Sequence, residues 1–165
     1  YARDKDAVVA TMLICELCAY YKSRGMSMYD GLMELYKKYG FYKEIIKSIT
    51  LKGVEGANNI KKILNTLRED ALKEVAGVKV VEARDYVADT IVNYVTGETS
   101  KTALPSSNVL YYQLEDGTWF CVRPSGTEPK IKVYFGSKAD TMEDVEAKLN
   151  KASEGIMKIV DDILA

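Results

Sequence analysis

The stretch RPSGTEPKIKVYF, from Arg123 to Phe135, places an arginine, two hydroxyl side chains, a glycine and two lysines ahead of an alternating apolar strand. Arginine presents a planar fork of N–H donors that matches phosphate or carboxylate oxygens, and it stays charged at any relevant pH. Ser125 and Thr127 add hydroxyl donors, while Gly126 lets backbone N–H groups come close to a ligand. The stretch therefore predicts a phosphate or carboxylate site.

Two predicted strands, residues 118–123 and 130–135, flank this loop and decide where its side chains point. Side chains alternate between the two faces of a strand. If the face that carries Arg123 coincides with the face that carries Lys132, both cations converge on one site. The alternative is a tight hairpin loop in which Arg123 pairs with Glu128 and the hydroxyls bond to their own backbone. The residues alone leave both interpretations open.

The overall composition excludes several kinds of chemistry. The 165-residue chain has no histidine, which removes Ser-His and Cys-His nucleophile pairs and imidazole metal ligands. Its formal net charge of −1 gives no overall attraction to nucleic acid or to an anionic membrane, so we expect neither as a partner. Any anion site must therefore be a local feature.

Three cysteines, Cys15, Cys18 and Cys121, raise the question of a metal site. Structural zinc usually needs four thiolate or imidazole ligands, and this chain offers three thiols. Cys15 and Cys18 share one face of an apolar helix, where we expect them to be buried as small hydrophobic residues. We therefore predict no metal site in this chain and a reducing compartment, the cytoplasm.

The first forty residues predict two helices. Residues 6–24 are apolar on nearly all sides, which indicates a helix that other structure must cover, and they are too short to span a bilayer. Residues 28–39 form a second helix, with Ser27 and Asp30 as a capping box. Because two helices in series need a sheet or partner helices, we expect residues 1–40 to be the remnant of a preceding domain.

The remaining residues, 41–165, predict a domain of their own, of the α+β class. Its expected core is a small antiparallel sheet with helices packed on one face. Residues 83–95 are ambiguous between a helical turn and extended chain, and residues 96–108 are predicted to be a loop. The expected strands are 42–52, 78–82, 109–114, 118–123 and 130–135, and the expected helices are 58–75, behind asparagine caps, and a last one from Met142.

The motif RPSGTEP, followed by KIKVY, resembles the phosphate-binding loop in the C-terminal domain of the α-D-phosphohexomutases, the phosphoglucomutase and phosphomannomutase family. The longer stretch LPSSNVLYYQLEDGTWFCVRPSGTEPKIKVYF is similar to that domain throughout its strands. ARDKDAVVATMLICELCAYY resembles the segment after the sugar-recognition loop of the third domain. The resemblance implies a C-terminal domain with a TATA-box-binding-protein-like fold, preceded by a helical remnant of an α/β domain.

The family's activity is implied in the same way. In these four-domain enzymes a phosphoserine of the first domain exchanges its phosphoryl group with a hexose phosphate through a bisphosphate intermediate. Mg²⁺ lies on an aspartate-rich loop of the second domain, outside this chain. The fourth domain binds the phosphate that is not reacting. The positions matching its phosphate contacts are Arg123, Ser125, Gly126, Thr127 and Lys132.

Lys5 matches a lysine that approaches the substrate in related enzymes. The alternative is an exposed residue in the first turn of a helix capped by Asp4.

The chain also departs from the family's full pattern. It has neither the catalytic serine context nor the Asp-Gly-Asp metal loop, so we expect the chain alone to be inactive. Its expected partners are a hexose phosphate and the N-terminal domains of the same protein. The alternative functions are a stand-alone phosphate-binding module without catalysis and a nucleic-acid binder built on a similar sheet.

Overall fold

The computed structural model describes residues 4–51, 53–126 and 128–165. The chain divides into two units, Tyr1–Phe41 and Tyr42–Ala165.

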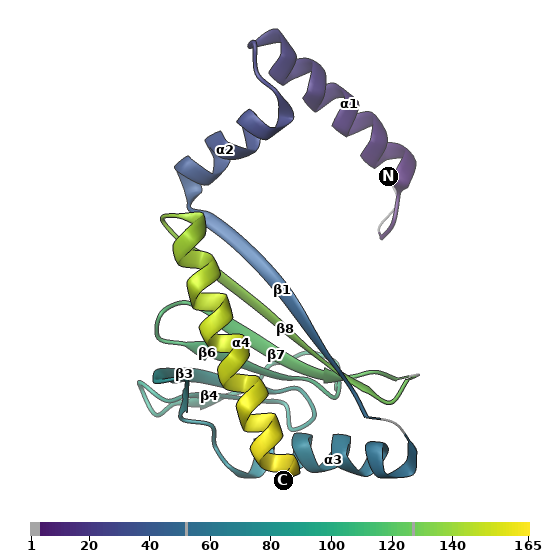
Figure 1. Ribbon diagram of the computed structural model, residues 1–165, viewed down its shortest axis with the longest axis vertical. Coiled ribbons are helices and arrows are strands. Elements are labelled where there is room, and N and C mark those ends of the chain that lie inside the picture. The colour runs from purple at the N-terminus through teal and green to yellow at the C-terminus, as the bar shows by residue number, and fades with distance from the viewer. Residues whose placement is uncertain (1–3, 52, 127) are drawn as a thin grey trace. The chain divides into compact units, whose positions relative to one another are not determined.

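The N-terminal unit consists of two helices, α1 (Ala7–Ser23) and α2 (Met28–Tyr39) (Figure 1). The predicted capping box of α2 is confirmed, because the Ser27 hydroxyl accepts from the Asp30 amide at 3.1 Å and the Asp30 carboxylate accepts from the Ser27 amide at 2.8 Å. The predicted cap of α1 is wrong. Asp6 caps this helix by accepting from the Val9 amide at 2.9 Å, so Lys5 lies before the helix.

The apolar surface of α1 is exposed in this unit. Val8 is 72% and Met12 is 67% exposed, and the one buried residue of α1 is Tyr21. Cys15 and Cys18 are exposed as well, contrary to the expected burial. The physical reason is that apolar residues surround the helix, whereas α2 can cover only one side of it. No helix in the described residues is both long enough and apolar enough to cross a membrane.

The C-terminal unit is built around one antiparallel sheet. The strands follow the order β1-β8-β7-β6-β3-β4-β5, with the short β2 paired to β3. The end of β1 meets the start of β8, where the Leu51 amide donates to the Pro129 carbonyl at 3.0 Å. Their bounds are β1 Phe41–Thr50, β2 Glu74–Val75, β3 Val78–Asp85, β4 Thr90–Asn93, β5 Thr99–Ser100, β6 Leu110–Leu114, β7 Trp119–Pro124 and β8 Lys130–Ala139.

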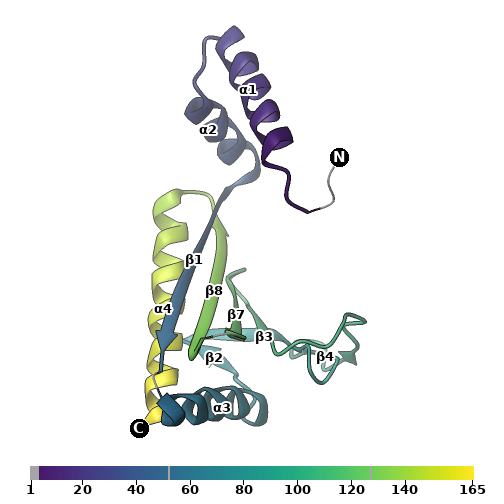
Figure 2. The same ribbon diagram turned by 90° about the vertical axis from the view of Figure 1, so that its right-hand side faces the viewer.

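Two helices, α3 (Gly53–Glu69) and α4 (Met142–Leu164), pack on one face of this sheet. Figure 2 shows α4 lying along one side of β1 and β8, with α3 near its C-terminal end. Alternate strand residues meet the two helices in the core, so the predicted α+β class is confirmed. The core contains Ile63, Leu64, Leu67, Val80, Leu110, Tyr112, Leu114, Phe120, Val122, Ile131, Val133, Phe135, Val145, Leu149, Ile156 and Val160.

The bounds of α3 differ from the prediction. The helix begins at Gly53, so Asn58 and Asn59 lie inside it and are not its caps. It ends at Glu69, and residues predicted to continue it form β2. The ambiguous residues 83–95 are mostly extended or turn, since β3 continues to Asp85 and pairs with β4.

Candidate functional site

The predicted phosphate loop connects β7 to β8, and the two faces of this hairpin have opposite character. Arg123 lies directly opposite Lys132, and Cys121 lies opposite Tyr134. Arg123 and Lys132 therefore lie on the same face of the hairpin, which the sequence alone did not decide. We call this the open face, because α3 and α4 pack on the other side. The packed face carries Phe120, Val122, Val133 and Phe135, all essentially inaccessible to solvent.

In the part of the chain that the structure describes, the arginine of the loop has no acidic partner. Among the described residues no carboxylate lies within 4.0 Å of the Arg123 guanidinium or of the Lys132 ammonium. The Glu128 carboxylate instead binds Lys130, at 3.1 Å. The alternative in which Arg123 pairs with Glu128 is therefore not formed. Two cations lie side by side on the open face, and such a pair favours a bound anion.

The backbone of the loop is held by short contacts of its own. The Ser125 amide donates to the Lys130 carbonyl at 2.8 Å. The Ser125 hydroxyl accepts from the Glu128 amide at 3.3 Å, so this part of the hairpin alternative, a hydroxyl bonded to the loop's own backbone, is formed for Ser125. Gly126 does not use the positive φ that glycine permits, and a Cβ there would meet nothing within 4 Å, so the space beside it is open. Thr127, the remaining loop residue of the predicted site, lies outside the described residues.

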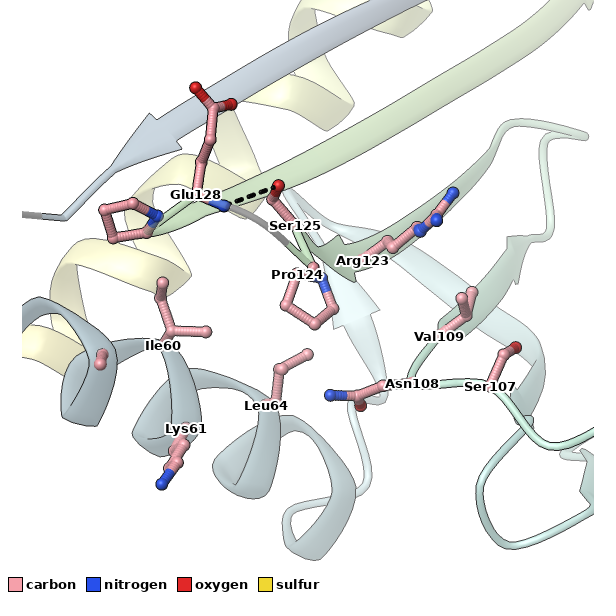
Figure 3. Close-up of a pocket in the computed structure, with 13 residues that line it drawn as sticks. Ile60, Lys61, Leu64, Ser107, Asn108, Val109, Arg123, Pro124, Ser125 and Glu128 are labelled. Atoms are coloured by element: carbon pink, nitrogen blue, oxygen red, sulfur yellow. Dashed lines mark hydrogen bonds between the residues drawn. The ribbon is translucent and has the colours of Figure 1, made fainter.

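The loop also borders a pocket of about 880 Å³ on the side of α3. Figure 3 shows the Pro124 ring directed toward Leu64 of α3, whereas the Arg123 guanidinium points away from that helix. The loop thus presents an apolar side to α3 and a cationic side to the open face. The pocket is lined by Ala57, Ile60, Lys61, Leu64, Ser107, Asn108, Val109, Arg123, Pro124, Ser125, Gly126, Glu128 and Pro129.

Sequence reasoning missed Ser107 and Asn108 as neighbours of the loop. Both line the same pocket as Arg123, and the Asn108 side chain accepts a hydrogen bond from Arg68 of α3. Arg68 in turn binds Asp85 at 3.1 Å, which ties this segment to α3 and β3. The available signal was a run of small polar residues directly before a strand, in a segment that was predicted only as loop.

The other predicted positions are less informative. Lys5 is exposed and belongs to the N-terminal unit. No group of three or more His, Cys, Asp or Glu residues that could hold a metal ion occurs in the described residues. The donor set of the described residues therefore does not fit a Mg²⁺ site.

The pKa of the Cys121 thiol depends on its surroundings on the open face. Partial burial raises the pKa of its thiol, and the positive charge of Arg123 acts in the opposite direction. Burial likewise raises the pKa of Tyr111, the next residue across the sheet from Cys121. Cys121 and Tyr111 are therefore half-buried positions of the open face, whereas Arg123 beside them is exposed.

The sequence matches the family described as "Phosphoglucomutase/phosphomannomutase, C-terminal domain" over residues 61–152. Phosphoglucomutases from Staphylococcus aureus strains bovine RF122 / ET3-1 and MRSA252 are each 35% identical to it over 150 residues, covering 91% of this chain and 27% of the relative. The chain thus spans about a quarter of the length of these curated relatives.

A solved structure has the same fold. It is the open form of the exocytosis-sensitive phosphoprotein pp63/parafusin, a phosphoglucomutase from Paramecium. The TM-score is 0.59 at 19% sequence identity, and the match covers 99% of this chain and 27% of that chain. At this identity the likeness concerns the fold alone.

Proposed function

This chain belongs to the phosphoglucomutase/phosphomannomutase family, and we propose that its β7–β8 loop binds the non-reacting phosphate of a hexose phosphate. The residues proposed for this role are Arg123, Ser125, Gly126, Thr127 and Lys132. The chain would serve a longer enzyme as its C-terminal domain, residues 41–165, with residues 1–40 as the end of the third domain. Lys5 would approach the substrate from that third domain.

One observation carries the proposal, the pairing of Arg123 with Lys132 on the open face. Two adjacent cations without an acidic partner in the described residues match a phosphate dianion in charge. A charge-assisted hydrogen bond contributes about 1.5–3 kcal/mol, so two such contacts already give measurable binding. The open space beside Gly126 leaves room for a ligand to approach the loop backbone.

In the mechanism that follows, this domain holds and orients the substrate and performs no chemistry itself. A phosphoserine elsewhere in the protein exchanges a phosphoryl group with one end of the sugar while the loop binds the phosphate at the other end. Fixing one end raises the effective concentration of the other at the reactive serine. The domain would close over the substrate as a lid. The Mg²⁺ of the enzyme would be bound outside this chain, and the enzyme would act in the cytoplasm.

The test is a calorimetric titration of the 165-residue chain with glucose 1-phosphate, comparing the unmodified chain with Arg123→Ala. We expect the substitution to weaken binding tenfold or more, since about 1.4 kcal/mol corresponds to one decade in affinity. Removing the guanidinium leaves Lys132 as the one cation of the pair.

The matched control is Lys130→Ala, which removes a cation that Glu128 already neutralises. We expect its affinity to stay within about threefold of the unmodified chain, because an exposed ion pair contributes about 0–1 kcal/mol. Equal affinity of Arg123→Ala and the unmodified chain would reject the proposal, as would equal losses in Arg123→Ala and Lys130→Ala.

A further inference from the structure

An apolar row lies directly beside the cation pair on the open face. Cys121 and Tyr134 are opposite one another, each two residues along its strand from Arg123 or Lys132. Two residues of a strand span about 6.8 Å. Both Cys121 and Tyr134 are half-buried and neither faces the helices. The cation pair and the apolar row are therefore close enough for one small ligand to contact both.

The row continues onto β1. The Leu51 amide bonds to the Pro129 carbonyl at 3.0 Å, and the Lys138 ammonium lies over the Tyr42 ring, 5.0 Å from its centre. Both contacts fit one antiparallel register of β1 against β8, and that register places Ile46 beside Tyr134. Ile46 is 57% exposed, so the edge of the row is open to solvent.

Tyr134 differs from the other aromatic residues of the open face. The Tyr111 ring stacks on Trp119, with 5.9 Å between the ring centres, and it also lies under Arg84 at 4.8 Å. In the described residues the Tyr134 ring makes no aromatic or cation–π contact of this kind. Among the described residues, Tyr134 thus lies two strand positions from the cation pair, and no neighbouring ring or cation engages its ring.

We infer that Tyr134 is the surface on which the sugar ring of the bound hexose phosphate lies. The inference rests on the proposed function, because it takes the phosphate to be bound by Arg123 and Lys132. A hexose presents C–H groups on the faces of its ring, and small-molecule sites combine an aromatic wall of this kind with a few oriented polar groups. An aromatic ring supplies contact area with little loss of side-chain freedom. Tyr134 is accordingly a residue that positions the sugar, whereas the cations bind its phosphate.

The experiment separates the sugar from the phosphate. The 165-residue chain and its Tyr134→Thr and Tyr134→Phe variants are titrated with inorganic phosphate and with glucose 1-phosphate. We expect Tyr134→Thr to weaken binding of glucose 1-phosphate about three- to tenfold, as an aromatic contact contributes about 0.5–1.5 kcal/mol. Its affinity for inorganic phosphate should stay within about twofold, and Tyr134→Phe should bind both ligands like the unmodified chain.

Each other outcome has a definite meaning. If Tyr134→Thr binds glucose 1-phosphate normally, or loses both ligands equally, the inference is wrong and the proposed function stands. If the unmodified chain binds neither ligand, the proposed function fails and the inference fails with it.

A second measurement needs no variant, in case Tyr134→Thr does not fold. Nuclear Overhauser contacts between the Tyr134 ring protons and sugar protons are expected in the unmodified chain with glucose 1-phosphate. Their absence, with glucose 1-phosphate bound, would overturn the inference.

Discussion

The two faces of the β7–β8 hairpin are made by alternate residues of the same two strands, yet they have opposite properties. On the packed face Val122 lies opposite Val133, and both are buried to within 1% of complete burial. One position further along, Arg123 lies opposite Lys132 on the open face, at a pair with no acidic partner in the described residues.

This difference separates the residues that stabilise the domain from those available for binding. Burial of apolar area contributes about 25 cal/mol per Å², so the packed face supplies stability. A pair of adjacent like charges contributes none and is mildly unfavourable. The cation pair is therefore not explained by folding, which is the argument for a ligand. The separation can be tested by substituting residues on each face and comparing the losses in stability and in binding.

The largest effect is expected from Phe120→Ala on the packed face. The Phe120 side chain is fully buried and stacks on Tyr112, with 4.8 Å between the ring centres. Its removal should lower the free energy of unfolding by about 3–5 kcal/mol, through lost apolar contact and the cavity left behind. Denaturant unfolding monitored by circular dichroism measures this loss.

Cys121→Ala is the matched control, since Cys121 is the next residue on the same strand but on the open face. We expect it to change the free energy of unfolding by about 1 kcal/mol or less, because its half-buried side chain loses only one sulfur atom. Similar losses in the free energy of unfolding for Phe120→Ala and Cys121→Ala would show that both faces stabilise the fold to the same extent. The proposed difference between the faces would then be wrong.

A smaller effect is expected where the packed face buries polar groups. The hydroxyls of Thr118 and Ser137 are both buried and bond to each other at 2.9 Å. Ser137→Ala leaves the Thr118 hydroxyl without this partner and should cost about 1–3 kcal/mol of unfolding free energy. The double variant Thr118→Val with Ser137→Ala should recover part of the loss, because it removes both polar groups. A double variant less stable than Ser137→Ala would contradict the expected penalty for a single buried hydroxyl.

The faces of this hairpin could be predicted from the sequence because strand alternation is a local rule. The short loop between the strand patterns 118–123 and 130–135 keeps the two strands adjacent. Their alternation then nearly determines the pairing of Arg123 with Lys132. The capping box of α2 was equally local, since Ser27 and Asp30 are three residues apart.

The start of α3 could not be predicted in this way, because it depends on a contact made only in the folded chain. Asn58 and Asn59 are residue types that often cap helices, which pointed to a later start. A Cβ at Gly56 would lie 1.9 Å from the Leu51 carbonyl oxygen, so glycine is required there for the first turn of α3 to pass close to the end of β1.

The end of α3 was missed for a related reason. Ala76 and Gly77 both have positive φ, 50° and 78°, and form the tight turn between β2 and β3. Alanine rarely adopts this conformation, so Ala76 gives no turn signal and Gly77 is the one residue of the pair that does. The neighbours of Arg123 at the site could not be predicted either. Ser107 and Asn108 lie in the segment before β6, and only folding brings them to the same pocket as Arg123.

The smallest effect should be seen in the chemistry of Cys121, which can show whether Arg123 acts across the open face. Partial burial raises the pKa of this thiol, and Arg123 opposes that rise. Since the thiolate is the nucleophile, Cys121 should be alkylated by iodoacetamide more slowly at pH 8 than the exposed Cys15 and Cys18. Mass spectrometry of time points measures the three rates separately.

Arg123→Gln should slow the alkylation of Cys121 further, because removing the positive charge raises the pKa of the thiol. The rates at Cys15 and Cys18 serve as internal controls and should not change. Added salt should reduce the difference between the unmodified chain and Arg123→Gln, since it screens the charge of a partly exposed guanidinium. If Arg123→Gln leaves the Cys121 rate unchanged at low salt, the charge of Arg123 does not reach its strand neighbour. The open face would then lack the electrostatic coupling between strand neighbours that distinguishes it from an ordinary solvent-exposed surface.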